Sequence, residues 1–122
     1  MKTKKYDLQR RLINFSISIM EIVEMLPKTY TGTHFKKQLV RSGTAPALLY
    51  GEAQAAESRK DFVHKMKIGL KELRESYITM TIIIEKPLLE NQKAAQTLHE
   101  CDELISIFFT SINTAKQNMK KR

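Results

Sequence analysis

Several residue types are scarce in this 122-residue sequence, and each scarcity excludes a class of structure. Trp is absent, and there are only three Pro and four Gly residues. β-Branched and aromatic residues nowhere alternate with polar residues over a strand-length run bounded by turn residues, so no strand is predicted. Helix-forming residues dominate, and residues 1–122 are enough for one domain with a core but too few for two.

Cysteine and long uncharged runs are also scarce. The single cysteine, Cys101, excludes an internal disulfide and agrees with a reducing compartment. The longest uncharged runs, such as residues 104–115, fall well below the roughly 18 residues that a membrane span needs. Residues 1–5 do not have the pattern of a signal peptide. We therefore expect a cytoplasmic protein that makes no use of a membrane.

Positive charge is abundant and unevenly distributed, with a formal net charge of +8. Residues 1–11 contain five Lys or Arg and one acidic residue, and residues 116–122 contain four Lys or Arg and no acidic residue. The remaining 12 basic and 12 acidic residues cancel, so the excess lies at the two ends. We expect the outermost residues, 1–6 and 120–122, to be frayed.

Apolar residues recur at intervals of three and four over most of the chain, which predicts amphipathic helices. The predicted helices cover residues 8–26, 33–57 and 59–85, with a fourth that begins after residue 91. Four helices joined by short turns pack antiparallel. The predicted fold is an all-α, up-down-up-down antiparallel four-helix bundle.

Local signals set the predicted helix boundaries. Ser58 has the spacing of an N-cap before the third helix, and Asn91 has it before the fourth. Either Thr31 or Thr33 could cap the second helix. Pro46 lies inside that helix, where it removes one backbone hydrogen bond and clashes with the preceding turn. We therefore expect a kink or a break near residues 42–45.

The central part of the chain carries a family resemblance. The residues that carry it are Arg41-Ser42-Gly43, Gly51-Glu52-Ala53, Ala56-Glu57-Ser58, Asp61-Phe62, Lys65-Met66-Lys67-Ile68 and Lys71-Glu72-Leu73-Arg74-Glu75-Ser76. This pattern resembles the signature of the bacterial four helix bundle protein family, also called the 23S rRNA intervening-sequence proteins. The accessory variability protein of diversity-generating retroelements is similar. The resemblance implies a homopentamer and a link to RNA.

The basic ends are the first candidate for a functional site. The start of the first helix and the end of the fourth share one pole of such a bundle, so their charges add into one positive tip. Lys and Arg near phosphates release counterions and bind nucleic acid with little sequence preference. The candidates are Lys4, Lys5, Arg10, Arg11, Lys116, Lys120, Lys121 and Arg122. Arg10 and Arg11 lie within a helix and are favoured for fixed contacts; the alternative is that the ends only solubilise the protein.

Charged residues of the family-like stretch form a second set. These are Arg41, Glu52, Lys67, Glu72 and Glu75. Glu52 lies among Gly and Ala residues, where backbones approach closely, so its carboxylate needs a partner. We interpret the set as a structural ion-pair network, with a binding site as the alternative.

No catalytic, metal or cofactor site is predicted. Nothing near the charged residues supplies an activated nucleophile. A di-metal centre in a four-helix bundle needs two Glu-x-x-His motifs, and the Glu-x-x-Glu pairs of this chain lack histidine partners at that spacing. We therefore expect a protein that is not an enzyme.

Apolar residues that lie outside the main apolar faces of the predicted helices suggest association between copies of the chain. They are Ile13, Ile17, Ile68, Ile78, Ile82 and Phe109. Exposed apolar stripes of this size usually mark an interface. We expect a homo-oligomer that binds RNA or an RNA–protein complex through a basic surface. The alternative is a scaffold or protein-interaction module without nucleic-acid contact.

Overall fold

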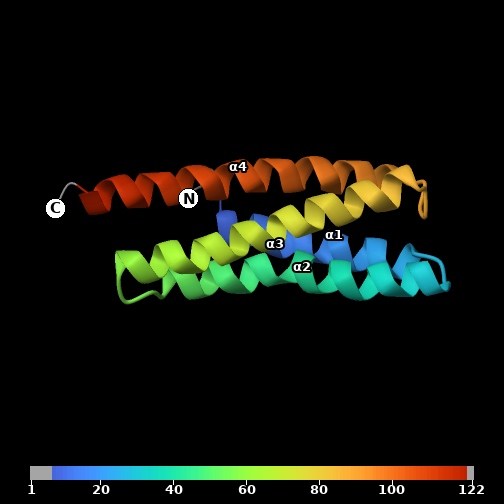
Figure 1. Ribbon diagram of the computed structural model, residues 1–122, viewed down its shortest axis with the longest axis horizontal. Coiled ribbons are helices and arrows are strands. Elements are labelled where there is room, and N and C mark those ends of the chain that lie inside the picture. Colours follow the sequence, from blue (N-terminus) through green and yellow to red (C-terminus); the bar gives the residue numbers. More distant parts are fainter. Residues whose placement is uncertain (1–6, 121–122) are drawn as a thin grey trace.

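Four helices make up nearly all of the chain that the computed structural model describes, residues 7–120, and this part contains no strand. The helices are α1 (Leu8–Met25), α2 (Tyr30–Gln54), α3 (Arg59–Glu85) and α4 (Gln92–Lys120). Consecutive helices run antiparallel, and α1 also packs against α4, which closes the bundle (Figure 1). The predicted all-α, up-down-up-down four-helix bundle is confirmed.

Polar caps fix where the helices begin. The Ser58 hydroxyl accepts a hydrogen bond from the Asp61 backbone N–H at 3.0 Å, and α3 has the bounds predicted from the sequence. The start of α2 was predicted three residues too late, because its cap is Thr29. The Thr29 hydroxyl accepts from the Gly32 N–H at 3.0 Å, and the helix begins at Tyr30.

The break that was one of the two outcomes predicted near residues 42–45 does not occur, because α2 continues through Pro46 as one helix. Proline has no N–H, so the carbonyl of Ser42, four residues earlier, loses its usual helical partner. The proline ring is fully buried in the core, and the Ser42 hydroxyl lies 2.8 Å from the hydroxyl of Ser76 on α3. Burial of the proline ring and the contact between Ser42 and Ser76 therefore stabilise this segment within the bundle.

The first helix is the shortest of the four. It has 18 residues, whereas α4 has 29, and this corresponds to lengths of about 27 and 43 Å. The end of α4 therefore extends well beyond the start of α1 (Figure 1). A groove of about 1090 Å³ occupies the space beside the first turn of α1, between the end of α2, the start of α3 and the second half of α4.

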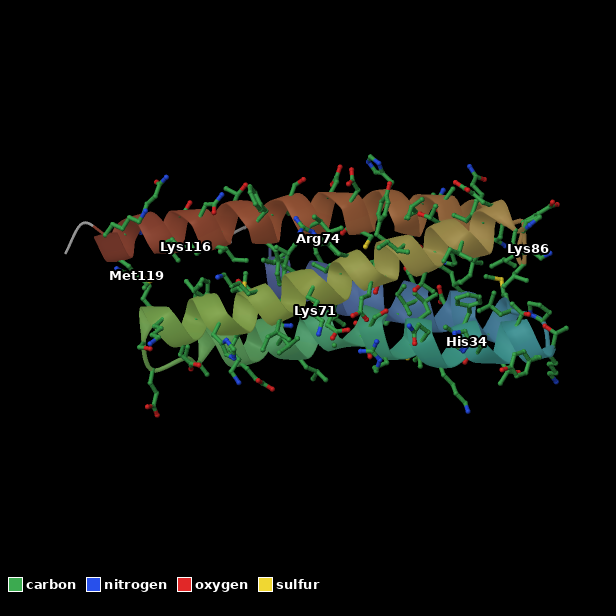
Figure 2. All side chains as sticks on the ribbon, viewed as in Figure 1. His34, Lys71, Arg74, Lys86, Lys116 and Met119 are labelled. Carbon is green, nitrogen blue, oxygen red and sulfur yellow. The ribbon has the colours of Figure 1, made fainter. Side chains whose placement is uncertain are left out.

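Charged and polar side chains point outward from all four helices (Figure 2). Within residues 7–120, no helix combines the length and the apolar character needed to cross a membrane. The polar surface encloses a core to which all four helices contribute.

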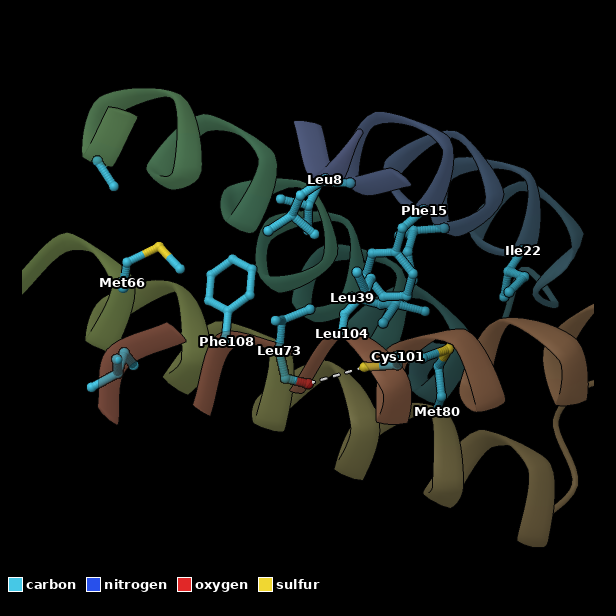
Figure 3. Packing of buried hydrophobic residues seen from close by; sticks show 14 of the residues in the cluster. Leu8, Phe15, Ile22, Leu39, Met66, Leu73, Met80, Cys101, Leu104 and Phe108 are labelled. Atoms are coloured by element: carbon cyan, nitrogen blue, oxygen red, sulfur yellow. Dashed lines mark hydrogen bonds between the residues drawn. The ribbon is translucent and has the colours of Figure 1, made fainter. Parts of the chain in front are cut away.

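Aromatic and aliphatic side chains fill this core (Figure 3). Phe15, Leu39, Leu104 and Phe108 are almost completely buried. The thiol of Cys101 is also buried, and it donates a hydrogen bond to a backbone carbonyl of α3 at 3.2 Å. Burial raises the pKa of the Cys101 thiol to about 12, so the thiol stays protonated at neutral pH.

A glycine lets α3 and α4 approach closely. A Cβ atom added to Gly69 of α3 would lie 2.7 Å from Cε2 of Phe108 on α4. Because Phe108 is fully buried, its ring has no free space to move into. The pair therefore fixes the level at which the two helices meet. A Cβ atom added to Gly43 of α2 would likewise lie too close to the side chain of Ile19 on α1.

We expect Gly69→Ala to be less stable than Gly51→Ala by about 1–3 kcal/mol, the usual effect of overpacking a core. A Cβ atom at Gly51 would meet only Oε1 of Gln9, at 3.5 Å, so that variant is the control. Both changes gain about 0.5–1 kcal/mol of helix stability over glycine. The difference in urea unfolding between the two variants therefore isolates the steric effect, and equal stabilities would contradict the close approach.

Candidate nucleic-acid interface

Arg11, one of the residues favoured for nucleic-acid contact, is held inside an ion-pair network. Its Nε and Nη2 atoms donate to Glu100 at 3.0 and 2.7 Å, and Nη2 also donates to Glu103 at 2.9 Å. The hydrogen bond that Arg11 donates to Glu100 contributes most to raising the pKa of Arg11. Two carboxylates thus compensate its charge, and the residue joins α1 to α4.

This contact also shows that α1 does not reach the basic end of α4. Glu100 precedes Lys116 by sixteen residues, or about 24 Å along the helix axis. The prediction of one tip shared by Arg10, Arg11 and the end of α4 is therefore wrong, because α1 begins too far from that end. Lys120 is the last residue of α4. The other candidates, Lys4, Lys5, Lys121 and Arg122, lie outside the described residues.

The charged residues of the family-like stretch divide into two groups. Arg41 on α2 donates from Nη1 to Glu72 at 2.9 Å and from Nη2 to Glu75 at 2.7 Å. The hydrogen bond to Glu75 is the largest cause that raises the pKa of Arg41. Glu52 is separate and accepts from Nζ of Lys65 at 2.9 Å. Lys67, the fifth member of the predicted network, joins neither group.

These contacts leave cationic positions exposed on α3. Between residues 60 and 74, the side of α3 that faces away from the core presents side chains at intervals of three and four, all of them exposed. They are Lys60, His64, Lys67, Lys71 and Arg74. Glu72 and Glu75 are turned toward Arg41 and do not compensate them. None of the five has an ion-pair partner in the part of the chain that the structure describes.

The end of α4 adds to this surface. The nearby ammonium group of Lys67 is the largest cause that lowers the pKa of Lys116, and Lys120 lowers it further. A lowered lysine pKa indicates like charges held together without an acid between them. We call Lys67, Lys71, Arg74, Lys116 and Lys120 the basic face. Figure 2 labels Lys71, Arg74 and Lys116, which lie along the neighbouring α3 and α4.

The groove beside α1 has a different character. Its lining contains apolar side chains such as Leu8, Phe62 and Ile107, together with hydroxyl groups of α4. In the described part of the chain, the charged side chains that line it are Glu57 and Arg59, whose charges oppose each other, so this part of the lining has no net positive charge. Among residues 7–120, no group of acidic, His or Cys side chains could hold a metal ion.

The α3 half of the basic face was not predicted, because the central region of the chain has no net charge when its acidic and basic residues are counted together. The available signal was positional, because Lys60, His64, Lys67, Lys71 and Arg74 share one helical side that contains no acid over that interval. Lys116 and Lys120 were among the predicted residues.

Comparison with known proteins is consistent with the resemblance. Residues 4–110 match the family described as 23S rRNA-intervening sequence protein. The chain is also similar to the crystal structure of a protein of unknown function from the S23 ribosomal protein family of Bacteroides thetaiotaomicron, with 24% identity and a TM-score of 0.80. That alignment covers 87% of this chain and 98% of the other, and it supports the fold alone. A comparison with curated proteins finds no match.

Proposed function

Because the chain belongs to the 23S rRNA-intervening sequence protein family, we propose that it is a non-enzymatic RNA-associated protein of the cytoplasm. It binds RNA, or an RNA–protein complex, through the basic face. The observation that carries this proposal is the convergence of exposed cations from α3 and α4 on one surface.

Like charges on this surface favour an anionic partner. Lys67 and Lys71 are four residues apart on α3, and Arg74 follows Lys71 by three, so each pair repels along the helix. Repulsion between Lys67 and Lys116 adds to this across the two helices. A polyanion relieves the repulsion and releases its own counterions. Contacts of this kind go to phosphates and tolerate many sequences.

We expect neutralising the basic face to weaken RNA binding and to reduce its salt dependence. The variant combines Lys67→Gln, Lys71→Gln, Arg74→Gln and Lys116→Gln, and the probe is an unstructured single-stranded RNA titrated at several salt concentrations. Each phosphate contact to a single strand contributes about 0.7 to the slope of log K against log salt, so losing four reduces the slope by about 3.

The matched control removes the same charge elsewhere, with Lys28, Lys36, Lys37 and Lys86 each changed to Gln. These cations lie outside the basic face, on the connection to α2, on α2 and after α3. If the control loses as much affinity and slope as the first variant, binding follows net charge and the assignment to this face fails. If the wild-type protein does not bind RNA, the scaffold alternative is favoured.

We also propose that the protein forms a homo-oligomer through two apolar patches. Ile17 and Met20 are exposed on α1, and Ile78 and Ile82 are exposed on α3. These helices do not contact each other and lie diagonally in the bundle, so the patches face in different directions. Contact between two different patches is heterologous and can close into a ring. A ring agrees with the homopentamer that the family resemblance implies.

Light scattering of the purified protein tests this proposal. We expect the wild-type mass to be a multiple of the 14.2 kDa chain, and the double change Ile78→Gln and Ile82→Gln to lower it. Polar side chains at these positions remove the apolar area that drives association. Tyr30→Gln is the control, because Tyr30 is 91% exposed and outside both patches. A wild-type mass of one chain would refute the oligomer.

A further inference from the structure

Resting on the proposed RNA binding, we infer that the basic face recognises single-stranded RNA, and that an unpaired base stacks on the ring of Phe109. Sequence analysis placed Phe109 among residues for contact between copies. Its position in the bundle supports a different partner.

Phe109 lies at the level of the cations on α3. It directly follows Phe108, whose ring packs against Gly69. On α3, Lys67 comes two residues before Gly69 and Arg74 comes five residues after it. Along the bundle axis, Phe109 therefore lies opposite the segment of α3 between Lys67 and Arg74.

Phe109 also shares the outward side of α4 with Lys116. The two residues are seven apart, which is two helical turns, so their side chains point in nearly the same direction. Lys116 faces Lys67 across the two helices. The aromatic ring thus stands on the basic face with cations from both helices around it.

The exposure of the Phe109 ring favours a partner with unpaired nucleic-acid bases, which are flat and can stack on it. The Phe109 side chain is 51% exposed, whereas Phe108 beside it is fully buried, so the bundle does not require an aromatic residue at position 109. Cations around an exposed aromatic ring are the combination that binds single strands, because phosphates contact the cations while a base stacks on the ring. In duplex RNA the bases are already stacked within the helix and cannot reach such a ring.

A tryptophan reporter tests the stacking directly. The chain contains no Trp, so Phe109→Trp introduces a single tryptophan on the basic face, whose fluorescence can be excited apart from that of the tyrosines. We expect its fluorescence to be quenched by single-stranded poly-uridine RNA and unaffected by a duplex RNA of equal length. Tyr30→Trp is the matched control, because that position lies at the start of α2, away from the basic face. We expect no quenching of that control by either RNA.

Affinity gives a second readout. Phe109→Leu keeps an apolar side chain but removes the flat ring, and we expect it to weaken binding of the single strand by about 5- to 100-fold, the effect of one lost stack. Binding of the duplex should change by less than about twofold, since phosphate contacts to the lysines remain. Tyr30→Leu should leave the affinity for both RNAs unchanged.

The outcomes separate this inference from the proposed function. If the quadruple basic-face variant weakens binding of both RNAs, but Phe109→Leu binds the single strand as wild type does, the inference fails and the proposed function stands. If neither RNA binds, both fail. If Phe109→Leu lowers the assembled mass in light scattering, the ring belongs to an interface between copies and the inference is overturned.

Discussion

The surface that we assign to RNA depends on how closely α3 and α4 pack. Gly69 provides space for the Phe108 ring, and this contact sets the level of one helix against the other. Once the position of a helix is fixed, the directions of its outward side chains are fixed as well, because the direction of a side chain from the helix axis follows from its place in the sequence. The same register brings Lys67 near Lys116 and leaves Phe109 exposed on α4. A change in register would separate the groups from which the basic face is built.

A second constraint separates the charges of α3. Arg41 on α2 binds Glu72 and Glu75, and Glu72 is largely buried by the contact. These acids therefore stabilise the α2–α3 pair, and the ion pairs that they make are with Arg41, not with the lysines of α3. Charge separation of this kind gives the charge-balanced central part of the chain a basic surface. The ion pairs of Arg11 have a related effect, because they keep that cation within the bundle.

Much of the fold could be predicted because its signals are local. The recurrence of apolar residues in α1 and the Ser58 cap before α3 are features of single helices. The start of α2 was missed because three threonines in that region could each act as a cap, and it is the Thr29 hydroxyl that accepts from the Gly32 N–H. The continuity of α2 through Pro46 depends on burial of the ring by other helices. The basic face was only partly predicted. Its α3 half becomes visible only when the acidic and basic residues are assigned to separate sides of the helix.

The titration of Lys116 tests the central claim most directly, because it reports whether α3 and α4 bring their cations together. The ε-carbon signal of each lysine can be followed by NMR as pH rises. We predict a pKa for Lys116 below the ordinary lysine value of 10.5, and a return toward that value in the Lys67→Met variant, where the repelling charge is gone. An ordinary pKa for Lys116 in both proteins would show that the two ammonium groups are not neighbours, and the basic face would not exist as described.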